Sequence, residues 1–291
     1  MLVYIIAVFL LTWIPQIVAV IQSRRLKNAE SSHKPPSQTL LGVIMFVPSL
    51  TLLGFIALRQ IPLDLAAFGL TTPNIAGLIL GFSVPIIYMA VLFIVLRPFS
   101  EIQNFSLTEG GMWHIKRRTI FDNFSSSAKK IKSKKPVVYI IDLFITVLVF
   151  VTFITFPALG EELAWRGYMQ PILVERFGVT LGILLIGIIW GLWHIPANLA
   201  GHNDEDNPKL NAFVFFLLQT VSMSFVLGGI RIVTGNIWPV AVAHATHNVM
   251  ESMFIKTFLV PRIGNVKYRT IETAVYMIFG VIGFLLVYIS V

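Results

Sequence analysis

Long apolar runs separated by short polar stretches make up most of this chain. An α-helix needs about 20 predominantly apolar residues to cross the hydrocarbon core of a bilayer. The runs that meet or approach this length are Leu2 to Ile21, Thr39 to Leu58, Ile75 to Leu96, Val137 to Leu159, Val179 to Ile195, Ala212 to Val233, Ile237 to Leu259 and Ala274 to Val291. We therefore predict an all-α fold, a polytopic membrane bundle of about eight transmembrane helices that forms a single membrane domain over residues 1–291.

Composition supports this prediction and narrows the chemistry. Hydrophobic residues make up 56% of the chain and charged residues only 12%, and the mean hydropathy is +0.81. These values are typical of an integral, multi-pass membrane protein. The chain contains no cysteine, which excludes disulfides, thiolate metal sites and cysteine nucleophiles.

Basic residues predict the orientation. Arg24, Arg25 and Lys27 follow the first run directly, and no basic segment precedes it, so this run resembles a retained anchor with Met1 outside. The connection 97–136 is also strongly basic. Its basic residues are Lys116, Arg117, Arg118, Lys129, Lys130, Lys132, Lys134 and Lys135, with Asp122 between them. The positive-inside rule places this loop in the cytoplasm, beside anionic lipid. We expect no nucleic-acid partner, because the stretch shows little sign of stacking aromatic groups on an ordered basic face.

Two adjacent carboxylates and an arginine follow the fourth apolar run. An ionised side chain at membrane depth costs about 2.5 to 3.5 kcal/mol on insertion scales, so such groups usually face a cavity or a partner. Glu162 and Arg166 are spaced i and i+4, which favours an ion pair, whereas Glu161 points about 100 degrees away. Glu161 is then free to take and return protons. The alternative is a pair of charges at the membrane surface.

A second polar cluster ends the fifth run, in the segment from Trp190 to Pro196. Gly187 and Gly191 form a small-residue pair that lets another helix approach closely. His194 lies on roughly the same face and should point into the bundle. Pro196 should end or kink the helix near His194. A purely structural histidine is the competing interpretation.

The third cluster lies in the seventh run. Asn236 is a candidate helix cap, and His244 and Asn248 follow one helical turn apart. Two donors spaced in this way can address one oxygen, as an oxyanion site requires. His247 can share this task, and Glu251 continues near the same face. Hydrogen bonds between helices, each worth about 1 kcal/mol or less in membranes, are the alternative.

In this order the three clusters resemble the motifs of the CAAX protease and bacteriocin-processing (CPBP) intramembrane proteases, which include the Ras-converting prenyl-protein endopeptidases. The family carries Glu-Glu-x-x-x-Arg, then an aromatic residue and x-x-x-His, then His-x-x-x-Asn. The corresponding residues here are Glu161, Glu162, Arg166, Trp190, His194, His244 and Asn248. Two features depart from the pattern: Trp190 replaces the usual phenylalanine, and His247 is an additional imidazole.

The resemblance implies an intramembrane endopeptidase with a catalytic core at about 137–260. It implies that Glu161 activates a water, with His194 helping to hold it, and that His244 and Asn248 stabilise the oxyanion. Glu162 and Arg166 would support the site. The implied partners are the lipid bilayer and a membrane-associated peptide, with prenylated C-terminal (CAAX-type) peptides and leader peptides both open as substrates.

Zinc is the cofactor that this site could require. If the enzyme depends on metal, Glu161, His194 and His244 are the candidate ligands. The chain has no His-Glu-x-x-His motif, and using the histidines as ligands would consume the oxyanion donors. Following the resemblance, we favour a mechanism without a metal or other cofactor.

Other classes of protein remain open. A non-catalytic membrane scaffold or bacteriocin-immunity protein could share the fold. A secondary transporter would also bury carboxylates and histidines, but its two halves should resemble each other, and these do not. The acidic run from Asp204 to Asp206 is most simply a solvated turn, with cation capture or substrate gating as alternatives.

Overall fold

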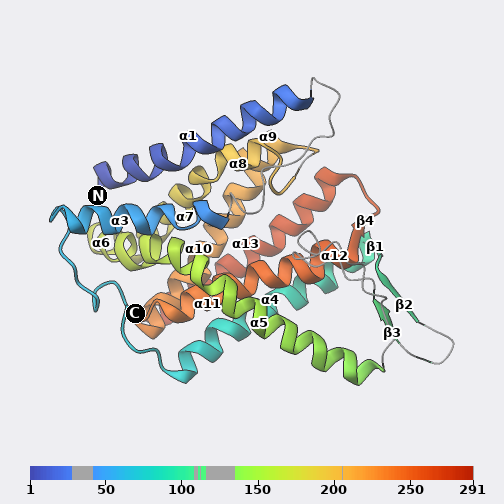
Figure 1. The fold of residues 1–291 in the computed structure, drawn as a ribbon. Helices are drawn as coiled ribbons and strands as arrows, with labels where there is room; N and C mark the ends of the chain where they lie inside the picture. Colours follow the sequence, from blue (N-terminus) through green and yellow to red (C-terminus); the bar gives the residue numbers. More distant parts are fainter. Residues whose placement is uncertain (28–41, 108–110, 112, 116–134, 205, 291) are drawn as a thin grey trace.

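The computed structural model describes residues 1–27, 42–107, 111, 113–115, 135–204 and 206–290. These residues form a bundle of helices with two small pairs of strands at one end (Figure 1). The basic residues from Lys116 to Lys134, on which the cytoplasmic placement rests, lie outside the described residues. The orientation of the protein in its membrane therefore stays a prediction.

Helices occupy every one of the predicted apolar runs, which confirms the all-α fold. The α-helices are α1 (Leu2–Lys27), α3 (Val47–Ala57), α4 (Ile75–Leu96), α5 (Pro136–Glu162), α6 (Gln170–Phe177), α7 (Val179–Trp193), α8 (Ile195–Leu199), α9 (Pro208–Leu210), α10 (Phe216–Thr234), α11 (Trp238–Met250), α12 (Lys256–Phe258) and α13 (Asn265–Ser290). The π-helical segments are η2 (Leu163–Met169), η3 (Asn211–Phe215) and η4 (Glu251–Ile255), and η1 (Arg97–Phe99) is a 3-10 turn.

The predicted count of eight membrane spans is not confirmed. Within the described residues, the helical stretches long and apolar enough to cross a bilayer are Ile75–Phe99, Pro136–Phe177, Pro208–Thr234 and Asn265–Ile289. Shorter apolar helices cover Leu2–Val18, Gly42–Ala57 and Val179–Trp193. The predicted run from Ile237 to Leu259 does not form one continuous α-helix. It divides into α11, η4 and α12 and ends in a strand, so α11 is too short to span a bilayer by itself.

The otherwise helical fold also contains short strands, which the apolar pattern did not predict. Strand β1 (Ser100–Ile102) pairs antiparallel with β4 (Leu259–Pro261), and β2 (Phe105–Leu107) pairs with β3 (Trp113–Ile115). The β1–β4 pair ties the end of α4 to the segment that follows α12. The strands occupy three residues each, too few to show a period-2 pattern in the sequence.

Small residues allow the central helices to approach closely. Helix α11 packs against α4 and α5, and α10 packs against α7 and α13. A Cβ atom on Gly187 would lie 2.6 Å from the Cα of Val221, and one on Gly191 would lie 2.5 Å from the Oγ1 of Thr220. The predicted close approach of another helix to this glycine pair is therefore confirmed, and the partner is α10.

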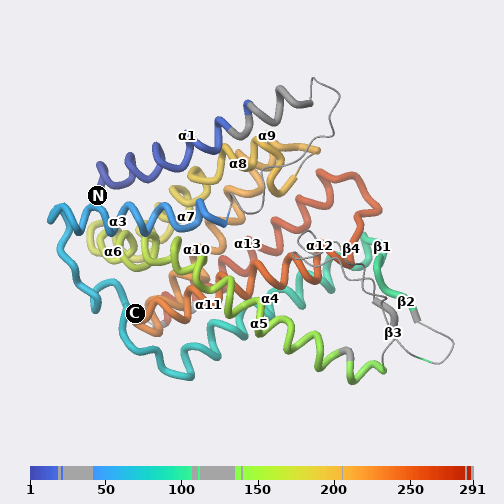
Figure 2. The backbone as a smooth tube through the Cα atoms, in the orientation of Figure 1, coloured from blue at the N-terminus to red at the C-terminus, as the bar shows by residue number. Residues whose placement is uncertain are grey.

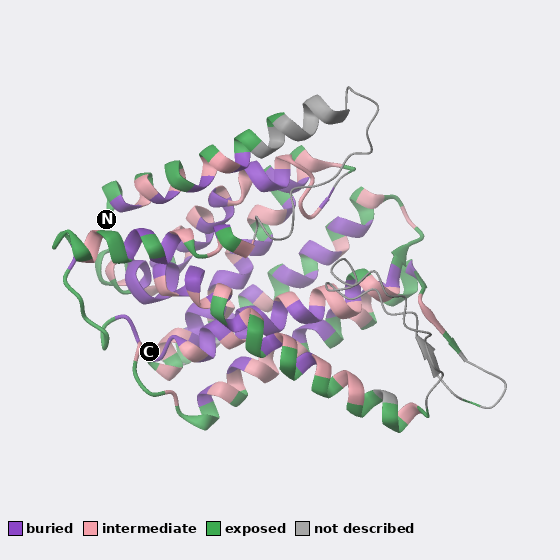
Figure 3. Ribbon diagram, viewed as in Figure 1, coloured by how far each residue is buried: buried purple, intermediate pink, exposed green. Residues whose placement is uncertain are grey.

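The bundle has a buried central core and an outer surface on which many large apolar side chains are exposed. The buried residues gather where α5 ends among α7, α10 and α11 (Figure 3). The first half of α5 instead runs outward from the bundle (Figure 2), and side chains such as Ile140 and Phe144 are exposed there. Exposed apolar surface of this extent is expected for a protein whose solvent is the bilayer.

Candidate active site

The two adjacent glutamates are the last residues of α5, and both are buried. Glu161 is 2% exposed and Glu162 is fully buried. Directly after them the helix widens into the π-helical segment η2, which includes Arg166. Such π-helical insertions are rare and frequently occur at functional sites. At Gly160 a Cβ atom would lie 2.8 Å from the carbonyl oxygen of Met45, so the chain before α3 closes this end of α5.

Glu162 is held by two basic side chains. Its carboxylate lies 3.0 Å from Nη1 of Arg166, and its Oε1 lies 2.7 Å from Nδ1 of His244. Arg166 also donates through Nη2 to the Oγ of Ser224 on α10, at 2.9 Å. The pairing of Glu162 with Arg166 predicted from their spacing is confirmed. A buried charge pair is tolerated only with good geometry and additional hydrogen bonds, and His244 and Ser224 supply them.

Glu161 has a different partner. Its Oε2 accepts a hydrogen bond of 2.7 Å from the indole Nε1 of Trp190 on α7. Among the residues that the structure describes, no ion pair involves Glu161. The two glutamates therefore differ in their direct contacts: Glu162 pairs with Arg166 and contacts His244, whereas Glu161 accepts a hydrogen bond from a neutral indole.

Trp190 connects the other groups of the site, a role that the sequence analysis missed. The centroid of its ring lies 4.5 Å from the Cζ of Arg166, in a cation–π contact, and 5.4 Å from the ring of His244. The sequence offered one signal for this role. An indole carries an N–H donor where the family's usual phenylalanine has none.

His194 lies at the break between α7 and α8, so the predicted effect of Pro196 is confirmed. Its Nδ1 lies 2.8 Å from the carbonyl oxygen of Trp190. Because a carbonyl only accepts, this Nδ1 carries the proton, and Nε2 of the neutral ring is left as an acceptor. The rings of Trp193 and Phe216, at 4.5 and 4.9 Å, confine the imidazole.

Asn248 lies one turn beyond His244 on α11, as the sequence predicts. Its described hydrogen bond goes to His247, whose Nδ1 lies 3.3 Å from the Oδ1 of Asn248. The contacts thus join Glu161, Glu162 and Arg166 with Trp190 of the second cluster and with His244 of the third. They attach Asn248 to the neighbouring His247 rather than to a glutamate.

At the N-terminus of α11, the Oδ1 of Asn236 accepts a hydrogen bond of 2.9 Å from the backbone N–H of Trp238. The residue directly before the helix is Ile237, and its side chain makes no capping hydrogen bond, so Asn236 is not the predicted helix cap. The bond from Trp238 to Asn236 instead closes the turn that leads into the helix with the third cluster.

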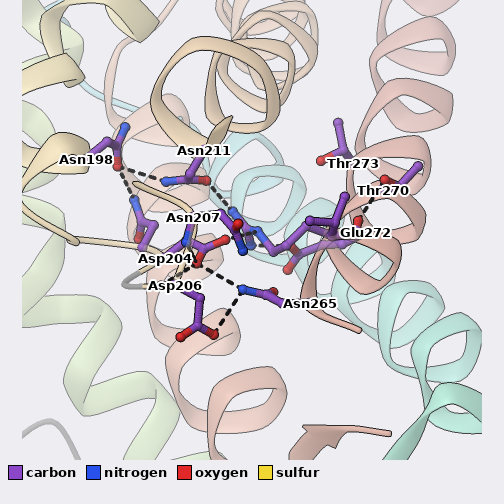
Figure 4. A network of polar contacts seen from close by, with 12 residues as sticks. Asn198, Asp204, Asp206, Asn207, Asn211, Asn265, Thr270, Glu272 and Thr273 are labelled. Atoms are coloured by element: carbon purple, nitrogen blue, oxygen red, sulfur yellow. Dashed lines mark hydrogen bonds and ion pairs between the residues drawn. The ribbon is translucent and has the colours of Figure 1, made fainter. Parts of the chain in front are cut away.

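A second polar network fixes the segment that follows His194 (Figure 4). The Oδ1 of Asn198 on α8 accepts from Asn203 at 3.1 Å and from Asn211 at 3.3 Å. Asn211 in turn accepts from Arg269 of α13 at 2.7 Å, and Arg269 is paired with Glu272. The network joins α8, η3 and α13 through groups that are almost completely buried.

Asp204 belongs to this network, so the interpretation of its loop as a solvated turn is wrong for this residue. Asp204 is 7% exposed. Its Oδ1 accepts from the backbone N–H groups of Asp206 and Asn207 and from the side chain of Asn265, at 2.9 to 3.0 Å. Its other oxygen, Oδ2, lies 3.9 Å from Nε of Arg269, so a cationic side chain already faces this carboxylate. Glu205 lies outside the described residues.

The same loop carries a histidine that stays neutral. Burial, reinforced by the positive charge of Lys256, lowers the pKa of His202 to about 4. The imidazole is therefore uncharged near neutral pH. Lys256 is itself paired with Glu251 at 3.0 Å, beyond the end of α11.

The described residues do not gather as a zinc site. Within the described ranges, no group of three His, Asp or Glu side chains is placed to hold a metal ion. A catalytic zinc needs three protein ligands and an open position. Of the alternative ligand set, Glu161 accepts from Trp190 through Oε2, and His194 donates from Nδ1 to a carbonyl group, which leaves its Nε2 as an acceptor. Within the described ranges, Glu161, His194 and His244 are not brought together as a metal-binding group.

Comparison with known proteins agrees with the class that the fold and the site define, a helical membrane protein with a buried glutamate and histidine cluster. Residues 143–250 match the family model of the type II CAAX prenyl endopeptidase Rce1-like proteins. CAAX prenyl protease 2 of Methanococcus maripaludis is 47% identical over 36 residues, a match that covers 12% of this chain and 13% of that relative. The resemblance indicated by the three motifs is confirmed, and residues 143–250 include every predicted site residue.

Proposed function

We propose that this protein is an intramembrane endopeptidase that hydrolyses a peptide bond near the membrane with water activated by Glu161. The family match supports the general activity. The observation that supports this mechanism is that the two glutamates have different contacts. Glu162 is paired with Arg166 and hydrogen-bonded to His244, whereas Glu161 is buried, outside any described ion pair and held through one oxygen by Trp190.

The proposed step is general base and then general acid catalysis. Glu161 takes a proton from water as the water oxygen bonds to the carbonyl carbon of the substrate. The peptide C–N bond then breaks, and Glu161 returns the proton to the leaving nitrogen. The products are a carboxylic acid and an amine, and Glu161 is again a carboxylate. The Nε2 of His194 helps to hold the attacking water by accepting its second hydrogen.

His244 and Asn248 stabilise the oxyanion in this proposal. His244 donates from Nδ1 to Glu162, and its imidazolium form also carries a proton on Nε2 for the oxyanion. The charges of Glu161, Glu162, Arg166 and an imidazolium at His244 sum to zero, which suits a buried site. Asn248 adds a neutral donor one turn further along α11.

The remaining parts of the proposal concern the cofactor, the substrate and the architecture. The mechanism uses no metal, because every role above is filled by a side chain. The substrate is a membrane-associated peptide, with prenylated C-terminal peptides and leader peptides as the two classes to test. We further propose a single membrane domain over residues 1–291, a catalytic core at about 137–260 and a cytoplasmic loop over 97–136.

Cleavage by Glu161→Gln protein tests the mechanism. Purified protein reconstituted in vesicles is offered a farnesylated C-terminal peptide and an unmodified leader-type peptide, and products are identified by mass spectrometry. Glu175→Gln is the matched control, because Glu175 is exposed on α6. We expect cleavage by wild type and Glu175→Gln and none by Glu161→Gln. Equal cleavage by all three proteins refutes the role of Glu161.

A further inference from the structure

The C-terminal helix α13 reaches the candidate site from outside the matched residues 143–250. Its Tyr276 is buried, at 4% exposure, and its hydroxyl lies 2.8 Å from Nε2 of His247. His247 is the imidazole that departs from the family pattern. Its other nitrogen, Nδ1, lies 3.3 Å from the Oδ1 of Asn248. A line of hydrogen bonds therefore runs from Tyr276 through His247 to Asn248.

The donor and acceptor chemistry of these groups fixes which atom donates in each hydrogen bond. The Oδ1 of Asn248 can only accept, so Nδ1 of His247 carries the hydrogen that it donates. In a neutral imidazole the other nitrogen is then an acceptor, and the Tyr276 hydroxyl must donate to Nε2. With its oxygen engaged by His247, Asn248 has both N–H donors of its amide left for another acceptor.

The packing around His247 stabilises these hydrogen bonds by shielding them from water. The His247 ring is 8% exposed and lies 5.9 Å from the ring of Tyr88 on α4, at an interplanar angle of 18°. The Tyr276 ring meets Tyr88 edge to face at 4.9 Å. Helices α4 and α13 thus enclose the imidazole. Water cannot readily replace the tyrosine hydroxyl in such a buried position.

We infer that Tyr276, acting through His247, is a positioning residue that fixes the amide of Asn248 with its nitrogen toward the substrate oxyanion. This inference rests on the proposed function, in which Asn248 is an oxyanion donor. An amide rotated by half a turn would present its oxygen to the developing negative charge and repel it. The tyrosine and the histidine together select the productive orientation, although neither contacts the substrate.

A double-mutant cycle of Tyr276→Phe and Asn248→Ala tests the inference with the reconstituted peptidase. Tyr276→Phe removes only the hydroxyl, and we expect kcat to fall about 5- to 10-fold with little change in KM, the loss typical of one buried hydrogen bond. In the Asn248→Ala background the same change should have almost no further effect, because the amide that it positions is gone. Tyr4→Phe is the matched control, since Tyr4 is fully buried and its hydroxyl donates to the carbonyl oxygen of Pro48 at 2.9 Å.

Two results would overturn the inference. The first is wild-type kcat in Tyr276→Phe protein, and the second is an equal loss with and without Asn248, which would mean a general structural role. If Asn248→Ala itself cleaves at the wild-type rate, the proposed oxyanion role has failed and this positioning role fails with it.

A second pair of variants gives an answer if Tyr276→Phe does not fold. The amide of His247→Gln can donate and accept, whereas His247→Leu can do neither. We expect the glutamine variant to keep a higher kcat than the leucine variant at equal KM. Equal kcat values in the two variants would overturn the inference.

Discussion

Replacing Trp190 by phenylalanine tests the hydrogen bond that Glu161 receives from the indole and Glu162 does not. The substitution keeps an aromatic ring and removes the indole N–H, which donates to the Oε2 of Glu161 at 2.7 Å. Phenylalanine is the family's usual residue at this position by resemblance, so the fold should accept it. Both partners are buried, with Trp190 at 5% and Glu161 at 2% exposure. Water is therefore a poor substitute for the lost donor.

The size of the expected effect follows from the charge of the acceptor. A hydrogen bond to a charged group contributes about 1.5 to 3 kcal/mol, which corresponds to about 10- to 150-fold in rate if the bond holds Glu161 in its reactive position. We expect most of the loss in kcat, because the contact orients a catalytic group rather than the substrate.

The assay is steady-state cleavage by reconstituted protein, with Trp165→Phe as the control. Trp165 is fully buried, and its indole nitrogen has no hydrogen-bond partner within the described part of the chain. The control therefore loses a similar volume and no hydrogen bond. If Trp190→Phe retains kcat within about twofold of the control, the proposed positioning of Glu161 by the indole is refuted.

Three further predictions concern stability and cofactor. Arg269→Gln breaks a buried pair with Glu272 and should lower the unfolding midpoint by about 5 °C or more, whereas Arg262→Gln removes an exposed pair and should change it little; equal midpoints would contradict this. Burial lowers the pKa of His202 to about 4, so the folded state loses stability as pH falls from about 6.5 toward 4, and His202→Gln should lessen this loss in thermal scans. An unchanged pH dependence would contradict the prediction. Exhaustive chelation should leave peptide cleavage intact, and a tightly bound metal whose removal abolishes turnover would reverse the metal-free proposal.

Local patterns predicted the features that depend on neighbours in the sequence. The spacing of Glu162 and Arg166 indicated their ion pair, because residues four apart face each other along a helix. The proline after His194 indicated the helix break, and the glycine pair on α7 indicated the close contact with another helix. Each prediction required only the geometry of one helix.

Contacts between distant segments were not predictable in this way. The indole of Trp190 reaches Glu161 because α7 packs beside the end of α5, and no spacing within either helix encodes that approach. Asp204 similarly has the composition of a solvated loop, yet α13 brings Asn265 and Arg269 to it. Tyr276 lies beyond the motifs altogether, so only the packing of α13 reveals its contact with His247.

Hydrolysis in oxygen-18 water tests the central claim most directly. Wild-type protein and its Glu161→Gln variant, each in vesicles, are incubated with the peptide that wild type cleaves. Mass spectrometry then measures the mass of the fragment that carries the new C-terminus. We predict that wild type incorporates oxygen-18 into the new carboxylate and that Glu161→Gln forms no product above background, while both proteins have the same thermal midpoint. Labelled product formed by Glu161→Gln at the wild-type rate would contradict activation of water by this glutamate.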